Sequence, residues 1–221
     1  MPSSLPGVDV EKLARQTTVR IKTGKFSGSG AIVRSSGQIY TVLTSWHVVA
    51  FERGDRTIVT WDGILHKPLL STVQRLGNTD LAIVQFRSHK EYKLAPISPE
   101  PAAVSETVLA AGFPGDSEVD AWVMTRGFVS LVLPKSLPQG YSLGYTNEVK
   151  IGMSGGPIFN AKGLLVGING RGKYRDPNFG VYAFEDGSEP TPELLEKMVK
   201  SSWGIPISIY LQLASFHLGS Y

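Results

Sequence analysis

The sequence contains no cysteine among its 221 residues. This absence excludes a disulfide scaffold, a thiol nucleophile and a cysteine-ligated metal, and leaves the redox compartment open. No apolar run approaches the length of a transmembrane helix. The first residues, MPSSLPGVDVEKLARQ, lack the apolar region of a signal peptide. We therefore expect an extracytoplasmic mature form, periplasmic or secreted, with an added Met1, and a cytoplasmic protein stays open as the alternative.

The chain also lacks a strong excess of charge. It carries 22 basic and 19 acidic residues, a net charge of +3. This balance is too mild to indicate binding to nucleic acid. The one local basic cluster, Arg171, Lys173 and Arg175, is typical of a solvated loop. Composition gives no indication of the oligomeric state.

Glycine and proline, by contrast, are plentiful, at 24 and 14 residues. They separate many short apolar runs, which is the pattern of an all-β protein. We predict two strands around a hairpin turn in 28–49, and further strands at 18–23, 56–61, 71–77, 81–86, 107–114, 121–133, 141–149, 155–160 and 163–169.

Helical signals are few. Residues 8–15 predict one or two helical turns, and 191–203 predict a helix capped by Thr191 with Pro192 in its first turn. Residues 204–213 are expected to return to the body of the fold. A proline-rich break at 95–106 divides the strands into two similar sets. We predict an extension (1–15), a first barrel (16–104) and a second barrel with the helix (105–221), with a cleft between the barrels.

The segment IGMSGGPIFN (151–160) places three glycines and a proline between apolar residues. Such a segment cannot form regular helix or strand. It is either a tight turn between strands or a turn that presents the Ser154 hydroxyl and aims backbone N–H groups at a substrate. The second interpretation requires a base and an acid elsewhere in the chain.

His47 in LTSWHVV and Asp80 in NTDLAIVQF are the candidates. Taken alone, His47 is better explained as a buried core histidine, and Asp80 as a turn cap at a strand start. Together with Ser154 they change the interpretation, because all three lie at junctions between a strand and a loop. A serine hydroxyl needs an imidazole to take its proton, and the imidazole needs a carboxylate to orient it. The N–H groups of Gly152 and Ser154 could then bind an oxyanion.

The blocks TSWHVV, DLAIVQF and GMSGGPIFN resemble the three signature blocks of the chymotrypsin/trypsin-fold serine peptidases. The resemblance extends over residues 16–213 and is closest to cysteine-free bacterial enzymes. It implies an all-β fold of two six-stranded Greek-key barrels with the active site between them and one C-terminal helix. It also implies a serine endopeptidase that acts on proteins or peptides through His47, Asp80 and Ser154, without a cofactor or a metal.

The sequence departs from the animal enzymes of that family at Met153. Their pattern has an aspartate there, which pairs with a new N-terminus after zymogen cleavage. A methionine cannot form that pair, and the chain has no IVGG-like start. We therefore expect activity without N-terminal processing, and no peptide-binding domain after residue 213.

The resemblance also assigns a primary specificity pocket. Six residues before the serine stands Glu148, and the pocket wall is expected from Asn169, Gly170 and Arg171. A carboxylate at the pocket base predicts cleavage after Arg or Lys. The alternative is that Glu148 pairs with Lys150, on the same face of an extended segment, which leaves a pocket for an apolar residue.

Other functions were weighed against this interpretation. GMSGG also fits the nucleophile elbow of α/β-hydrolases, with His217 and either Asp176 or Asp186 as partners, but the chain lacks the alternating strands and helices of that fold. A silent protein-binding module on the same scaffold stays open. His66 and His89 are isolated and predict solvated loops rather than a metal site. Calcium held by loop carbonyls stays open, although no D-x-D-x-D spacing occurs.

Overall fold

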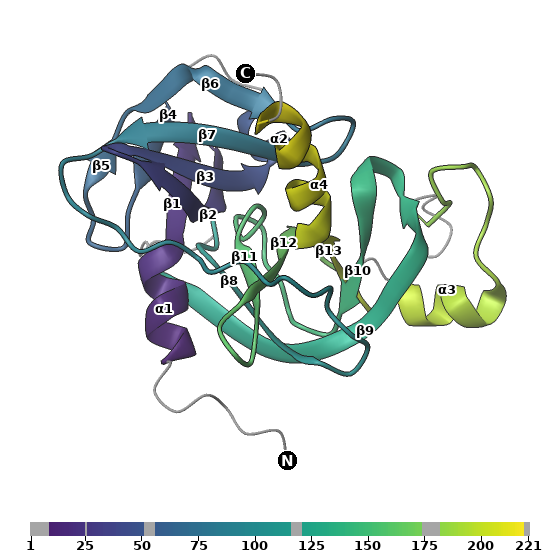
Figure 1. Ribbon diagram of the computed structural model, residues 1–221. Coiled ribbons are helices and arrows are strands. Elements are labelled where there is room, and N and C mark those ends of the chain that lie inside the picture. The colour runs from purple at the N-terminus through teal and green to yellow at the C-terminus, as the bar shows by residue number, and fades with distance from the viewer. Residues whose placement is uncertain (1–8, 25, 51–55, 116–120, 174–181, 219–221) are drawn as a thin grey trace.

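The computed structural model describes residues 9–24, 26–50, 56–115, 121–173 and 182–218. Two antiparallel β-sheets lie side by side, one built from the first half of the chain and one from the second (Figure 1). This arrangement confirms the all-β fold of two barrels.

The first sheet has seven strands in the order β5-β4-β1-β2-β3-β7-β6. Because β4 lies beside β1 of the meander β1-β2-β3, the sheet contains a Greek key. The predicted hairpin turn in 28–49 is confirmed, since Ser36 pairs with Ile39 across a two-residue turn. The strands are β1 (Thr18–Thr23), β2 (Phe26–Ser36), β3 (Ile39–Ser45), β4 (Arg56–Val59), β5 (Leu65–His66), β6 (Pro68–Arg75) and β7 (Leu81–Arg87).

The second sheet closes into a six-stranded barrel in the order β10-β13-β12-β11-β8-β9. It too is a Greek key, because β11 returns to lie beside β8 of the meander β8-β9-β10. Its strands are β8 (Thr107–Gly112), β9 (Val123–Leu137), β10 (Tyr141–Tyr145), β11 (Pro157–Asn160), β12 (Leu165–Arg171) and β13 (Ser202–Pro206). The strands of the two sheets fall within the predicted ranges 16–104 and 105–221, whose boundaries stay predictions.

In the described part of the chain, the sheets are accompanied by the α-helices α1 (Val10–Thr17), α2 (Trp46–Val49), α3 (Pro192–Met198) and α4 (Ile207–Leu218) and by the 3-10 turn η1 (Pro138–Gly140). The side chain of Asp9 caps α1, and that of Thr191 caps α3 as predicted, with Pro192 in its first turn. In Figure 1, α4 reaches from the second barrel back to the first sheet. Among the described residues, no helix has the length and apolar character needed to cross a membrane.

Several predicted elements differ from the structure. The first sheet has seven strands rather than six, because the two-residue strand β5 pairs with the end of β4. The predicted helix 191–203 ends at Met198, since Ser202 and Trp203 pair with β10 as part of β13. The strand that was expected to continue to residue 49 ends at Ser45, and a single helical turn follows.

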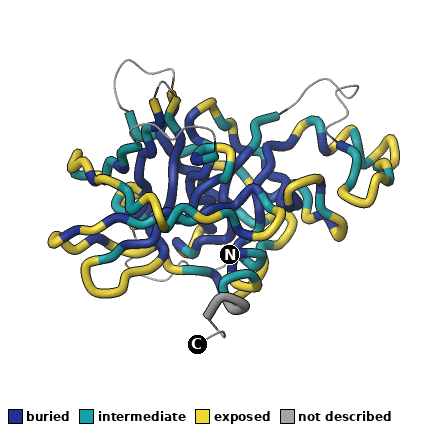
Figure 2. Tube along the Cα trace, turned by 90° about the horizontal axis from the view of Figure 1, so that it is seen from above, coloured by how far each residue is buried: buried dark blue, intermediate teal, exposed yellow. Residues whose placement is uncertain are grey.

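The hydrophobic core includes one cluster that crosses from sheet to sheet. Leu43 and Leu81 of the first sheet belong to the same buried cluster as Leu137, Phe159 and Trp203 of the second. Each sheet also has a smaller buried cluster of its own. Figure 2 shows the buried chain running through the centre of both sheets, with exposed residues on the surrounding loops.

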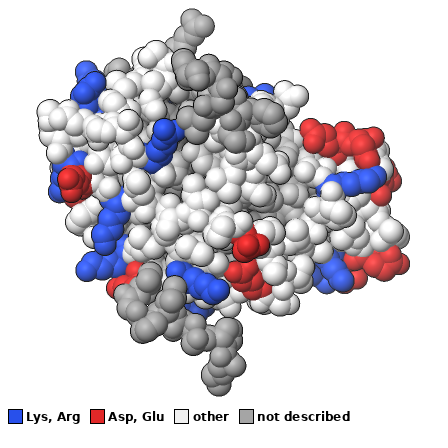
Figure 3. Space-filling model, viewed as in Figure 1, with Lys and Arg blue, Asp and Glu red and all other residues white. Residues whose placement is uncertain are grey.

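Charged side chains are distributed unevenly over the face seen in Figure 3. Acidic side chains gather at the end of the molecule that carries α3, whereas basic side chains lie mostly on the opposite side, separated by uncharged surface. On this face, therefore, the basic side chains do not merge into one patch.

Candidate active site

His47 and Asp80 come together at the end of the first sheet. His47 lies in α2, directly after β3, and Asp80 directly precedes β7, the neighbour of β3. The imidazole Nδ1 of His47 lies 2.6 Å from Oδ2 of Asp80, and the backbone N–H of His47 donates to Oδ1 over 2.8 Å. The two donors fix the plane of the carboxylate relative to the ring.

The Asp80 side chain is almost completely buried, whereas that of His47 is 43% exposed. Burial raises the pKa of Asp80, but hydrogen bonds from His47, its positive charge when protonated, and a hydrogen bond from Tyr141 more than offset burial, so the pKa is lowered. Asp80 is therefore a buried anion, and its partner, the imidazole of His47, is the exposed member of the pair.

Ser154 lies in the turn before β11, on the second barrel. Its Oγ donates to the backbone carbonyl of Gly170 over 3.1 Å, and among the described residues it makes no hydrogen bond with His47. Both side chains nevertheless line the same cavity of 420 Å³. Catalytic hydrogen bonds are often long or poorly aligned until substrate binds.

The backbone before Ser154 has a shape that requires glycine. Gly152 adopts φ of +93°, and a Cβ there would lie 2.4 Å from the nitrogen of Gly115 and 2.6 Å from the oxygen of Phe113. Within the described part of the chain, the N–H groups of Gly152 and Ser154 donate to no protein acceptor. Two donors are thus left next to the serine hydroxyl.

The backbone carbonyls of residues 151–153 in this loop each accept a hydrogen bond from another part of the chain. The Ser29 hydroxyl donates to the carbonyl of Gly152 over 2.8 Å, the Asn169 amide donates to that of Met153 over 2.9 Å, and the Gly115 N–H donates to that of Ile151 over 2.9 Å. The Met153 side chain is completely buried. In the animal enzymes of the family that the sequence resembles, an ion pair between an aspartate and the new N-terminus supports this loop. Here the buried Met153 side chain and uncharged hydrogen-bond donors support it instead.

A second cavity, of 480 Å³, shares His47, Ile151 and Ser154 with the first. It is lined by the predicted wall residues Asn169, Gly170 and Arg171, and by Lys150 and Lys173. Three cationic side chains therefore border it, and the cluster predicted to be a solvated loop contributes two of them. The third member of that cluster, Arg175, lies outside the described residues.

Glu148 occupies a different position. Its side chain is 75% exposed and accepts a hydrogen bond from Lys173. It is not among the residues that line either cavity beside Ser154. The Glu148 carboxylate therefore lies beside Lys173, one of the cationic side chains that line the 480 Å³ cavity.

The cavity of 420 Å³ has a different lining. Phe26, Val48 and Ile151 give it an apolar wall, and Thr23 and Ser27 join His47 and Ser154 as its polar members. Phe26 and Ile151 are among the most exposed apolar side chains in the described part of the chain, at 72% and 88%. The candidate nucleophile is thus flanked by one apolar cavity and one cationic cavity.

The residues of the other hypotheses lie elsewhere. His66 was expected in a solvated loop, and this is wrong: it is buried in β5 against Phe86, with Nε2 3.0 Å from the Tyr92 hydroxyl. Asp186 pairs with Lys135 at the surface. Asp176 and the side chain of His217 lie outside what the structure describes. No group of three or more potential metal ligands occurs among the described residues.

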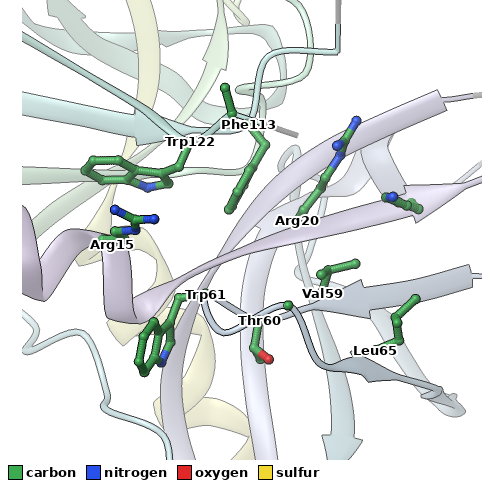
Figure 4. Close-up of a pocket in the computed structure, with 11 residues that line it drawn as sticks. Arg15, Arg20, Val59, Thr60, Trp61, Leu65, Phe113 and Trp122 are labelled. Atoms are coloured by element: carbon green, nitrogen blue, oxygen red, sulfur yellow. The ribbon is translucent and has the colours of Figure 1, made fainter. Parts of the chain in front are cut away.

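A further cavity, of 540 Å³, has walls from both halves of the chain. Figure 4 shows Arg15, Trp61, Phe113 and Trp122 pointing into it from α1, the β4–β5 turn and the segments that flank residues 116–120. None of the sequence-predicted site residues lines it. No motif in the sequence indicates this cavity, because its walls come from segments far apart in the chain.

Residues 28–168 match the family model described as "Trypsin-like peptidase domain". Glutamyl endopeptidase from Staphylococcus aureus (strain MW2) is 26% identical over 185 residues, which are 76% of this chain and 54% of that protein. The chain thus spans about half the length of the curated relatives that it matches.

Solved structures of similar shape include the serine endoprotease from Yersinia pestis, with a TM-score of 0.67 at 18% identity over 98% of this chain and 69% of that one. An inactive form of Rv3671c from M. tuberculosis H37Rv has a TM-score of 0.68 at 18% identity, over 100% of this chain and 98% of that one. At these identities the likeness concerns the fold.

Proposed function

Because this chain belongs to the trypsin-like peptidase family, we propose that it is a serine endopeptidase that uses His47, Asp80 and Ser154. The observation that carries the proposal is the bidentate contact between Asp80 and His47, made beside a cavity that Ser154 also lines. This contact supplies the orienting acid and the base that a serine nucleophile requires.

In the proposed mechanism, the hydroxyl of Ser154 turns from the Gly170 carbonyl toward Nε2 of His47 when substrate binds. His47 takes the proton as Oγ attacks the peptide carbonyl, and Asp80 stabilises the imidazolium. The N–H groups of Gly152 and Ser154 donate hydrogen bonds to the oxyanion, each contributing about 3 kcal/mol to transition-state stabilisation. His47 then returns the proton to the leaving amine, and water hydrolyses the acyl-enzyme by the reverse sequence.

Labelling with a fluorophosphonate tests the nucleophile. We expect one phosphonate per chain on Ser154, loss of labelling in Ser154→Ala, and a strong reduction in His47→Ala with the fold unchanged. A chain that binds peptides but is not labelled would instead be the silent binding module.

For the substrate, the cationic cavity favours an acidic side chain before the scissile bond. Lys150, Arg171 and Lys173 border it, while Glu148 is exposed and paired with Lys173. Opposite charges attract strongly where water is partly excluded. The named activity of the relatives in Staphylococcus aureus is in line with this preference. The sequence-based expectation of Arg or Lys rests on Glu148 and is the competing proposal.

Matched peptides with Glu, Asp, Arg, Lys or Leu before the scissile bond separate the two preferences. We expect the highest kcat/KM for Glu or Asp, a fall of about tenfold in Arg171→Gln, which corresponds to about 1.4 kcal/mol, and little change in Glu148→Gln. Faster cleavage after Arg, lost in Glu148→Gln, would establish the basic preference instead.

A further inference from the structure

The tip of the β9–β10 hairpin reaches from the second barrel to Asp80 of the first sheet. The backbone N–H of Asp80 donates to the carbonyl of Gln139 over 2.9 Å, and the Tyr141 hydroxyl donates to Asp80 Oδ2. The catalytic acid is therefore held at its backbone and at its side chain by residues 139–141.

Tyr141 is built into this position. It is completely buried, and the Arg171 guanidinium lies 4.3 Å from the centre of its ring. A Cβ on Gly170 would lie 2.2 Å from its hydroxyl oxygen, so the absence of a side chain at residue 170 leaves room for the phenol. Burial, and then the charge of Asp80, raise the pKa of Tyr141 well above its usual value, so the phenol stays a neutral donor.

We propose that Tyr141 is a positioning residue that sets the orientation and the effective charge of Asp80, and through it the basicity of His47. The inference rests on the proposed function. Oδ2 of Asp80 is shared between Nδ1 of His47 and the Tyr141 hydroxyl, while Oδ1 accepts from the His47 backbone. With both oxygens engaged, the carboxylate cannot rotate away from the imidazole.

The sharing of Oδ2 also determines in which direction loss of the Tyr141 hydroxyl shifts the pH profile. A hydroxyl that donates to Oδ2 draws negative charge from the carboxylate. Without it, the carboxylate acts on His47 more strongly, so the imidazolium is favoured and the acidic limb of the pH profile moves to higher pH. The carboxylate also gains freedom to rotate, so fewer molecules hold the imidazole in the productive orientation and kcat falls.

The test is Tyr141→Phe, compared with Tyr40→Phe as the control. Tyr40 is a buried tyrosine of the first sheet whose hydroxyl accepts from the backbone of Tyr92. In Tyr141→Phe we expect kcat to fall about tenfold, the value of one hydrogen bond to a charged group. We also expect unchanged KM, an acidic limb of kcat/KM displaced to higher pH, and a His47 Nδ1–H proton resonance displaced to lower field. Tyr40→Phe should leave all four unchanged.

A second variant guards against a Tyr141→Phe protein that does not fold. Fluorotyrosine at position 141 keeps the hydroxyl and makes it a stronger donor, so the acidic limb and the resonance must move in the opposite directions. An unchanged limb and resonance in either variant would overturn the inference, as would equal effects in Tyr40→Phe. If the wild-type chain cleaves no peptide, the proposed function fails, while the His47 resonance still tests the Tyr141 contact.

Discussion

At the scale of single residues, Asp80 makes the stability of the protein depend on pH. The pKa of Asp80 is lowered in the folded state from its ordinary value of 3.8. A depressed carboxyl pKa contributes stability that is fully present above the unfolded value and is lost as pH falls through the folded one. We expect the free energy of unfolding to fall below about pH 4.

Asp80→Asn isolates this contribution. The variant loses the charge-assisted bonds to His47, so its free energy of unfolding at pH 7 should be about 2 kcal/mol lower, and the difference from wild type should shrink toward pH 3. Urea midpoints at pH 7, 5 and 3 measure both quantities. A constant difference at all three pH values would contradict the assignment.

Met153 allows a prediction about activation. Because donors from Ser29, Gly115 and Asn169 hold the loop, the 221-residue chain should be active without trimming. Met153→Leu should cost less than about 1.5 kcal/mol of stability and keep activity. Met153→Asp should cost several kcal/mol, since it buries an unpaired carboxylate, and should lose activity. Peptide hydrolysis and melting curves measure these effects, and an inert chain that trimming near residue 16 switches on would refute the prediction.

The sequence predicts some of these residues and not others. His47, Asp80 and Ser154 stand in three short blocks whose chemistry becomes visible when the blocks are considered together. Tyr141 gives no such signal, because its contact with Asp80 depends on the length of the β9–β10 hairpin and on how the two sheets dock. The same holds for Glu148, whose distance from the serine in sequence does not determine whether it points into a pocket or toward Lys173.

At the scale of secondary-structure elements, α4 is a helix that the sequence analysis did not predict. Residues 207–213 carry Ile, Tyr and Leu side chains with hardly any polar residue between them. A helix with apolar residues on all sides has no 3.6-residue periodicity that separates it from a buried strand. The strand β5 was missed for another reason, since two residues are too few to form a pattern.

Ser29, near the start of β2, connects the first sheet to the second half of the chain by hydrogen bonds. The Ser29 hydroxyl accepts from the backbone of Phe113 over 2.9 Å while it donates to Gly152, and it is completely buried. Ser29→Ala should lower the free energy of unfolding by about 1–3 kcal/mol, because the Phe113 N–H loses its acceptor, and should also lower kcat, because the Gly152 peptide loses a support.

The control is Ser98→Ala, which removes a similarly buried hydroxyl that donates to the Glu100 carbonyl over 2.7 Å. It should lower stability alone. Urea denaturation and steady-state kinetics on both variants separate the two effects, and equal kcat in all three proteins would show that Ser29 does not support the loop.

At the scale of the whole molecule, the shared core predicts cooperative unfolding. Leu43 and Leu81 of the first sheet are buried in the same cluster as Leu137 and Trp203 of the second. Separating the sheets would expose this cluster, so neither sheet should persist alone. We expect tryptophan fluorescence and far-ultraviolet circular dichroism to report a single, coincident urea transition. Two transitions would mean that the sheets are independent domains.

The hairpin tip of residues 139–141 has a consequence for the order of events during synthesis. Chains emerge from the ribosome with the N-terminal part first. A nascent chain that exposes only the first sheet carries His47 and Asp80, but it lacks both the nucleophile and the tip that holds Asp80 in place. In the proposed mechanism, peptide hydrolysis therefore requires both sheets, so a nascent chain that exposes only the first sheet does not cleave itself or its neighbours.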